Sequence, residues 1–478
     1  MLRFLIISLF LPVVVYTQRV TVADEINVRN DYAYDILGQV GKNILLFRDK
    51  GINYYINIYD SNLRFIRESE LRFPSKRVRI ASIIPRDSTF NVIYNFRERD
   101  TSYLMVNVYD ESCFIKDTVL LEKTEDQNYP RFFRYTISED MTKTVLFNVS
   151  RDGFLHVIVI ENRMNRLLWR SKYDLVDVDM DNQFRKIVLS NEGVVFLLFE
   201  KENVRGARDR HFANLIGLYQ QTVVLQSNID LTTRVTNDMD MAFNNMTGHI
   251  IIVGLSSNKS ANEATEYFFV NKTIGAFNEF EKPTEISIGA EFITEIYGKL
   301  KKKKQALEDY EIRDIVPRQD GGFILITEMN REFSRRSAFT NAPIIRPTIM
   351  DGMRGWTDHY NEDIAVFAVR GNQTEHWRKV LYKKQFSQDD QGIYSSFFVF
   401  KTPSRLKIIY NDEIKNNNTV SQYIINPIGK FERNSLLSTF YQNLRLRFTS
   451  AKQISNQVLL VPSEKNYNLR LVKIDYTS

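Results

Sequence analysis

The sequence predicts an all-β chain that folds as a β-propeller of four-stranded blades. An apolar run of alternating side chains that ends in a polar turn recurs from one end of the 478 residues to the other. A second strand precedes each run, and weaker strands flank most of these pairs, so the repeating unit holds four strands. Aromatic residues make up 13% of the chain, which favours strands.

The recurring run marks the third strand of each predicted blade. Its copies begin with YYINIYDS and YLMVNVYDE and end with LRLVKIDY. The first turn residue of each copy recurs about every 50 residues, apart from one doubled interval before Arg370. These residues are Asp60, Asp110, Glu161, Gln220, Asn271, Arg370, Asn426 and Asp475. Eight copies predict eight blades, and seven blades with one degenerate copy is the alternative.

The two ends of the chain predict how the ring closes. The last copy ends at its third strand, in NLRLVKIDYTS, so its blade lacks a fourth strand. The segment QRVTVADEINV, which begins at Gln18, is a strand left over before the first blade. We expect this segment to complete the last blade, so that residues 18–478 form a single propeller domain. A two-domain sandwich fits less well because the spacing persists along the whole chain.

Two insertions interrupt the sixth copy and explain the doubled interval. Residues 289–309 precede its first strand and read partly as a short basic helix, and residues 330–362 separate its second and third strands. Because the strands alternate in direction, loops between second and third strands share one face with the links between blades. Both insertions therefore belong to this face, and long loops on a rigid scaffold commonly carry function.

Arginine and aromatic residues gather in these long loops, and they are the candidate residues for binding a partner. The guanidinium group matches carboxylate and phosphate, and aromatic rings stack on sugar or peptide. The candidates are Arg205, Arg208, Arg210, Arg335, Arg336, Arg346, Arg354, Trp356, His359 and Tyr360. A set of solvated polar loops is the plainer interpretation of the same residues.

The first residues have the composition of a secretory signal peptide. Arg3 is followed by an apolar stretch from Phe4 to Val15, and small residues stand before Gln18. The stretch is shorter than the ~20 residues that span a bilayer, so we expect residues 1–17 to be cleaved and no transmembrane segment to follow. Cys113 is the only cysteine, which excludes a lipoprotein anchor and favours a periplasmic or secreted bacterial protein.

The sequence carries no motif for a cofactor, a metal or a catalytic centre. The five histidines lack metal-binding spacing, and no P-loop, G-x-S-x-G or G-x-G-x-x-G motif occurs. His156 sits inside the apolar run LHVIVI and is expected to pack in the core. The formal net charge is only +6, so a nucleic acid is not the expected partner. We predict no cofactor, no metal and no catalytic residue.

The region from Tyr310 to Asp412 carries several motifs in a fixed order. DGGF opens one strand, YNEDI begins the next, EHW lies in the one after, and DDQGIYS forms the following link. In this order the motifs resemble uncharacterised secreted β-propeller-like proteins of Bacteroidota bacteria. The resemblance implies the fold and a secreted location, and it implies no activity. The middle motif departs from the family pattern by one extra acid, Glu362.

The sequence therefore predicts a non-enzymatic binding or scaffold module of the cell envelope, with its ligand on the long-loop face. The expected partner is an envelope protein or an anionic glycan. The alternative is a carbohydrate hydrolase or lyase on the same face, for which Asp389 and Asp390 with Glu362 or Asp363 offer a carboxylate pair. An enzyme needs acids or histidines that converge near the central channel, whereas a binding module shows an aromatic and arginine surface.

Overall fold

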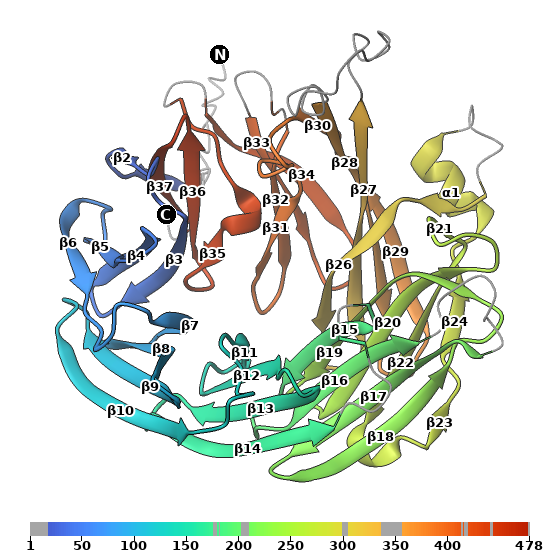
Figure 1. Ribbon diagram of the computed structural model, residues 1–478. Helices are drawn as coiled ribbons and strands as arrows, with labels where there is room; N and C mark the ends of the chain where they lie inside the picture. Colours follow the sequence, from blue (N-terminus) through green and yellow to red (C-terminus); the bar gives the residue numbers. More distant parts are fainter. Residues whose placement is uncertain are drawn as a thin grey trace, which may run out of the picture.

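The computed structural model is an eight-bladed β-propeller, in which eight sheets built on four antiparallel strands are arranged in a ring (Figure 1). It describes residues 18–174, 179–180, 182–201, 210–298, 305–335, 356–412, 414, 419–439 and 443–476. The predicted eight-bladed fold is confirmed, and the seven-bladed alternative is wrong.

The first four blades follow one another along the chain. Blade 1 contains β3 (Ala33–Val40), β4 (Asn43–Asp49), β5 (Tyr54–Tyr59) and β6 (Phe65–Leu71). Blade 2 contains β7 (Arg79–Pro85), β8 (Thr89–Glu98), β9 (Thr101–Asp110) and β10 (Ile115–Thr124). Blade 3 contains β11 (Arg134–Ile137), β12 (Lys143–Val149), β13 (Phe154–Glu161) and β14 (Arg166–Asp174). Blade 4 contains β15 (Phe184–Leu189), β16 (Val195–Lys201), β17 (Phe212–Tyr219) and β18 (Thr222–Asp230), and β23 (Phe280–Glu281) pairs with β18.

The last four blades include the additions to the repeat. Blade 5 contains β19 (Val235–Asn244), β20 (His249–Ser257), β22 (Glu266–Thr273) and β24 (Thr284–Ser287). Blade 6 contains β26 (Tyr310–Pro317), β27 (Phe323–Arg335), β28 (Trp356–Val369) and β29 (Glu375–Leu381), with β30 (Gln385–Gln388) added to β28. Blade 7 contains β31 (Phe397–Lys401), β32 (Leu406–Asn411), β33 (Thr419–Ile425) and β34 (Phe431–Ser438). Before blade 6 lie helix α1 (Ala290–Tyr297) and the paired strands β21 (Glu263–Ala264) and β25 (Leu307–Glu308).

Blade 8 is completed by the N-terminal segment, as predicted. Its strands are β35 (Lys452–Gln453), β36 (Val458–Lys465), β37 (Asn468–Asp475) and β1 (Arg19–Val22), and β2 (Ile26–Asn27) also pairs with β37. β1 runs antiparallel to β37, with Val20 opposite Ile474. One blade thus holds both ends of the described chain, and the backbone hydrogen bonds of that sheet close the ring.

The apolar core is divided into layers between neighbouring blades. The buried residues form eight clusters, and each cluster joins two successive blades around the ring. Leu45 of β4 packs toward blade 2, while the next residue, Leu46, packs toward blade 8. Successive side chains of a strand point to opposite faces, so a strand buried on both faces reads as a continuous apolar run. This explains the dense apolar pattern of the repeat.

Two of the turn residues that mark the repeat, Asp60 and Asp110, have the same structural role. The Asp60 carboxylate accepts hydrogen bonds from the backbone N–H groups of Asn62 and Arg64, both at 2.8 Å. Asp110 does the same one blade later, at 2.9 Å to both donors. Cys113 lies in this second turn with a φ of 60° and is buried, although the repeat places it in the fourth strand. A short polar side chain at this point satisfies the turn, which is why Asp recurs there.

The largest chain additions, helix α1 and the added part of blade 6, lie on one face of the ring, which we call the long-loop face. It carries the connections between second and third strands and the links between blades, and the opposite face, with the other turns, is the short-turn face. Helix α1, β30 and the adjoining ends of β27 and β28 stand out from the ring on the long-loop face (Figure 1). Phe292 and Ile296 of α1 are buried in the cluster between blades 5 and 6, so the helix caps that layer.

Candidate functional site

The most prominent feature of the long-loop face is a three-stranded extension of blade 6. Residues 330–335 of β27 pair with residues 356–361 of β28, and β28 pairs there with β30. A register shift between Glu328 and Asn330 separates this part of β27 from the blade. We call residues 330–335, 356–361 and 385–388 the blade-6 tip.

The tip brings together four of the ten candidate residues from the sequence. Arg335 and Trp356 are opposite each other in the β27–β28 pairing, and His359 and Tyr360 follow on β28. Because His359 and Tyr360 are neighbours in one strand, their side chains lie on opposite surfaces of the tip. Arg210 is exposed just before β17 on blade 4 and is not part of the tip. Outside the described residues lie Arg205, Arg208, Arg336, Arg346 and Arg354.

One surface of the tip is a row of arginine and aromatic side chains. The pairing places Arg331, Tyr360 and Phe386 side by side on three adjacent strands. The Arg331 guanidinium lies 5.4 Å from the centre of the Tyr360 ring, and the rings of Tyr360 and Phe386 are 5.0 Å apart. Phe333, on the same surface of β27, is 56% exposed. Exposed arginine and aromatic side chains of this kind are enriched at protein interfaces.

The other surface of the tip is covered by the link from blade 6 to blade 7. His359 has Glu332 opposite, with 3.9 Å between Nδ1 and Glu332 Oε2. Gly392 of the link has a φ of +66°, and a Cβ at that position would stand 3.6 Å from the His359 ring. The glycine thus fits a left-handed turn that packs against the imidazole. His359 therefore packs against the link, and Tyr360 is half-buried on the opposite surface of the tip.

The DDQGIYS motif builds this link. The Asp389 carboxylate accepts the backbone N–H of Thr357 at 2.8 Å, and the Asp390 carboxylate accepts that of Gly392 at 3.0 Å. The Tyr394 hydroxyl donates to the Glu464 carbonyl of blade 8 at 2.8 Å. Asp389 and Asp390, considered above as members of a carboxylate pair, thus hold backbone groups of the tip and the link, which is a structural use of both acids.

A buried ionic network lies at the base of the tip. Glu328 and Lys383 are fully buried, and their charged atoms are 2.6 Å apart. Lys383 also donates to the Asn361 carbonyl and to Gln385 Oε1, each at 2.7 Å. Burial lowers the pKa of the Lys383 ammonium group, and the neighbouring Glu328 opposes that shift. The network joins β27, β28 and the link, so it fixes the tip to the blade.

Two ion pairs join the inner strands of neighbouring blades. Lys186 on β15 lies 2.9 Å from Asp240 on β19, and Lys401 on β31 lies 2.7 Å from Asp314 on β26.

In the part of the chain that the structure describes, no group of three or more His, Cys, Asp or Glu side chains is arranged to hold a metal ion. Among the described helices, none is long and apolar enough to cross a bilayer.

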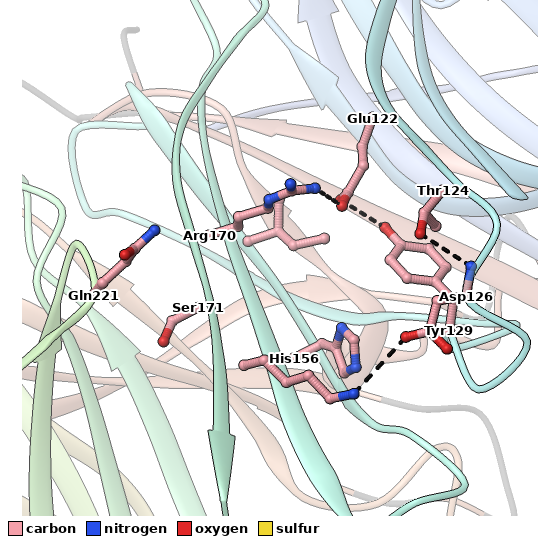
Figure 2. A pocket seen from close by; sticks show the side chains of 10 residues that line it. Glu122, Thr124, Asp126, Tyr129, His156, Arg170, Ser171 and Gln221 are labelled. Carbon is pink, nitrogen blue, oxygen red and sulfur yellow. Dashed lines mark hydrogen bonds and ion pairs between the residues drawn. The ribbon is translucent and has the colours of Figure 1, made fainter.

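A second concave site lies between blades 2 and 3 and has a volume of about 490 Å³. Arg170 of β14 forms an ion pair with Glu122 of β10, and Glu122 accepts a hydrogen bond of 2.9 Å from the Tyr129 hydroxyl (Figure 2). His156 of β13 lies beside this chain of contacts, with its ring edge-on to Tyr129 at 5.6 Å. We call this site the blade 2–3 cleft.

The sequence did not indicate the blade 2–3 cleft. His156 is buried, as expected, but the other lining residues come from blades 2 and 3, from the link between them and, at Gln221, from blade 4. The register places His156 opposite Lys172 and Ile158 opposite Arg170, so all four side chains share one surface. The polar run RSK, directly after Trp169, is the local signal in the sequence, and it does not show which residues of blade 2 lie opposite.

Comparison with known proteins supports no functional assignment. No family model and no curated protein matches the chain. Among solved structures, the chain is similar to the Dos1 propeller, with 7% identity and a TM-score of 0.44 over 95% of this chain and 94% of that one. It is similar to the polysaccharide lyase Uly1, with 8% identity and a TM-score of 0.41 over 95% and 100%. It is also similar to a protein of unknown function from Bacteroides caccae, with 9% identity and a TM-score of 0.28 over 73% and 93%.

Proposed function

We propose that the protein is a non-enzymatic binding module and that the blade-6 tip holds its partner, a protein of the cell envelope. The observation that carries the proposal is the row of Arg331, Tyr360 and Phe386, in which the arginine is exposed and the two rings are half-buried, with the exposed Phe333 beside it. Rigid aromatic rings bury a large area at low entropic cost, and arginine adds directional hydrogen bonds, so such rows form the energetic centre of many interfaces.

The mounting of the tip supports the same proposal. The side of the tip that carries His359 is packed against the link, and its base is held by the Glu328–Lys383 pair. A surface held in this way loses little conformational freedom when a partner binds, and preorganisation of that kind favours affinity. The acids of the link are engaged by backbone N–H groups, which favours a binding role over the hydrolase or lyase alternative.

The proposal includes a periplasmic or secreted location. It rests on the signal-like sequence of residues 1–17 and on the resemblance of residues 310–412 to secreted Bacteroidota proteins. An anionic glycan is the alternative partner, because Arg331 would match a carboxylate or sulfate group. N-terminal sequencing of the protein recovered from its natural cells tests the location, with Gln18 as the expected first residue.

Photo-crosslinking from the tip tests the proposed function. A benzoylphenylalanine at the position of Phe333 should yield one reproducible protein adduct in extract from the source cells. The matched control places the same probe at Ile428, which is 60% exposed in a turn on the short-turn face. The proposal is wrong if both positions yield the same adducts or if only Ile428 yields one. If the adduct is lost after glycan digestion, the partner is a glycan and not a protein.

A further inference from the structure

The blade 2–3 cleft has two walls of opposite charge. Arg170 and Lys172 project from β14 on blade 3, and Glu122 and Asp126 face them from β10 and the link after it. Arg170 contacts Glu122, and Lys172 Nζ stands 3.8 Å from Asp126 Oδ2. Two ion pairs thus span the cleft. The lining holds two cations and two carboxylates, and Lys172 Nζ also lies 2.8 Å from Asp152 Oδ2, just outside the lining.

His156 lies inside this cleft and has no hydrogen-bond partner for a buried ring nitrogen. The residue is 8% exposed, its Nε2 atom is buried, and no described residue donates to that atom or accepts from it. A buried polar atom without a partner costs free energy, and such atoms in native proteins call for an explanation. The imidazole is among the lining residues, so a small molecule in the cleft is the candidate partner for Nε2.

We propose that the blade 2–3 cleft binds a neutral, hydroxyl-rich ligand, namely a sugar. The volume of about 490 Å³ falls in the range of small-molecule sites. Each sugar hydroxyl both donates and accepts, so it can bond to the carboxylates, to the cations and to His156 Nε2 in one arrangement. Tyr129 and Ile158 supply an apolar part of the lining against which a sugar ring can pack.

The charge balance of the cleft decides against a charged ligand. An anion would be attracted by Arg170 and Lys172 but would also approach Glu122, whose side chain is 7% exposed. A cation would meet the same conflict with the signs reversed. Breaking the Arg170–Glu122 pair to remove the conflict would leave the buried Glu122 carboxylate without its cation, and this is costly. A neutral polyol adds hydrogen bonds and leaves both ion pairs in place.

Saturation-transfer NMR on the full chain tests the proposal directly. The probes are glucose, galactose and mannose, with glucuronic acid and glucosamine as the anionic and cationic counterparts of glucose. We expect saturable binding of at least one neutral hexose and binding at least about tenfold weaker for its charged counterpart. If no neutral hexose saturates the protein, or if a charged counterpart binds as tightly, the proposal is wrong.

Three variants locate the binding to the cleft. His156→Phe keeps a ring beside Tyr129 and removes both ring nitrogens, and Lys172→Met removes a cation that is 40% exposed. Each should weaken hexose binding about tenfold, the effect of one lost charged or buried hydrogen bond. The matched control is Arg166→Met on β14, the strand that carries Lys172, which removes the ion pair of the exposed Arg166 side chain with Glu161 of β13. Hexose binding that is unchanged in both cleft variants would overturn the assignment, as would equal weakening in Arg166→Met.

The test of sugar binding is independent of the test of the blade-6 tip, because the cleft lies on other blades. Crosslinking from Phe333 can succeed while hexose binding fails, and the reverse is equally possible. Circular dichroism of each variant at the temperature of the titration confirms that a loss of binding is not a loss of fold. If His156→Phe were unfolded, Lys172→Met would still decide the question, since its side chain lies at the edge of the cleft.

Discussion

Blades 4 and 6 share a buried glutamate at the end of the second strand but differ in what lies beyond it. Glu200 and Glu328 have almost no exposed surface, and each accepts a hydrogen bond from an arginine of the inner strand. The distance is 2.7 Å from Arg185 Nε to Glu200 and 2.8 Å from Arg313 Nε to Glu328. The recurrence of this pair two blades apart indicates that it belongs to the scaffold.

The second partner of each glutamate comes from a different place. In blade 4 it is His211, at the start of the third strand, with 2.9 Å between Nε2 and Glu200 and 3.1 Å between Nδ1 and the Arg234 carbonyl. In blade 6 it is Lys383, from the link after the blade. The third strand of blade 6 continues into the tip, so the link supplies the cation instead. A buried glutamate at the same place in the blade therefore stabilises an ordinary blade in blade 4 and the base of the tip in blade 6.

We expect the largest loss in the free energy of unfolding when the glutamate charge of blade 6 is removed. Glu328→Gln leaves Lys383 buried without its counter-ion and should cost about 3–5 kcal/mol of the free energy of unfolding. Urea denaturation measures this loss. The double variant Glu328→Gln with Lys383→Met should recover part of the stability, because the uncompensated charge is gone. No recovery would show that the pair is not coupled.

The corresponding change in blade 4 should be milder. In Glu200→Gln the His211 ring can remain hydrogen-bonded to the amide, and Arg185, which is 36% exposed, can turn to solvent. We expect a loss of about 1–2 kcal/mol in the same urea experiment. If Glu200→Gln lost as much unfolding free energy as Glu328→Gln, the identity of the partner, histidine or buried lysine, would make no difference to stability.

Acid should abolish the contribution of Glu200. Burial acts to raise the pKa of the Glu200 carboxyl, but the hydrogen bond from His211 and the charge of Arg185 outweigh it and hold the pKa below the ordinary value of 4.5. The unfolded chain therefore binds the proton first, and this stability is present above pH 4.5 and lost as the pH falls through the folded pKa. The gap in unfolding free energy between wild type and Glu200→Gln should shrink below pH 4.5, and a constant gap would contradict this assignment.

The tip itself should contribute least to stability. Tyr360→Ser removes a half-buried ring and its contact with Arg331, and that contact is worth about 1 kcal/mol or less. Thermal unfolding followed by circular dichroism should give nearly the same midpoint as wild type. A drop as large as that of Glu328→Gln would mean that the tip is part of the scaffold rather than an addition to it.

The repeat could be predicted from the sequence because every strand follows the same burial rule. Leu45 and Leu46 face different blades, and this double burial produces the dense apolar runs that repeat along the chain. The extent of the tip was harder to predict. The register shift after Glu328 breaks the alternation of β27, so residues 330–335 do not continue the pattern of the blade.

The candidate sites were less visible than the fold because their residues come from separate strands and, in the blade 2–3 cleft, from separate blades. His359 and Tyr360 stood out as an aromatic and basic pair, but only the strand pairing shows that they face opposite ways. Lys383 and Glu328 are far apart in sequence, and their residue types give no sign of burial. The blade 2–3 cleft depends on the meeting of β10 and β14, for which the sequence offers no local motif.

The central claim is that the blade-6 tip binds a partner and that the rest of the ring supports it. The most direct test measures the yield of the Phe333 adduct in two backgrounds, Tyr360→Ser on the tip and Tyr219→Ser on blade 4, where Tyr219 is 37% exposed. We predict that the adduct disappears in the first background and persists in the second, with unchanged unfolding midpoints. An adduct that persists equally in both backgrounds would contradict the claim.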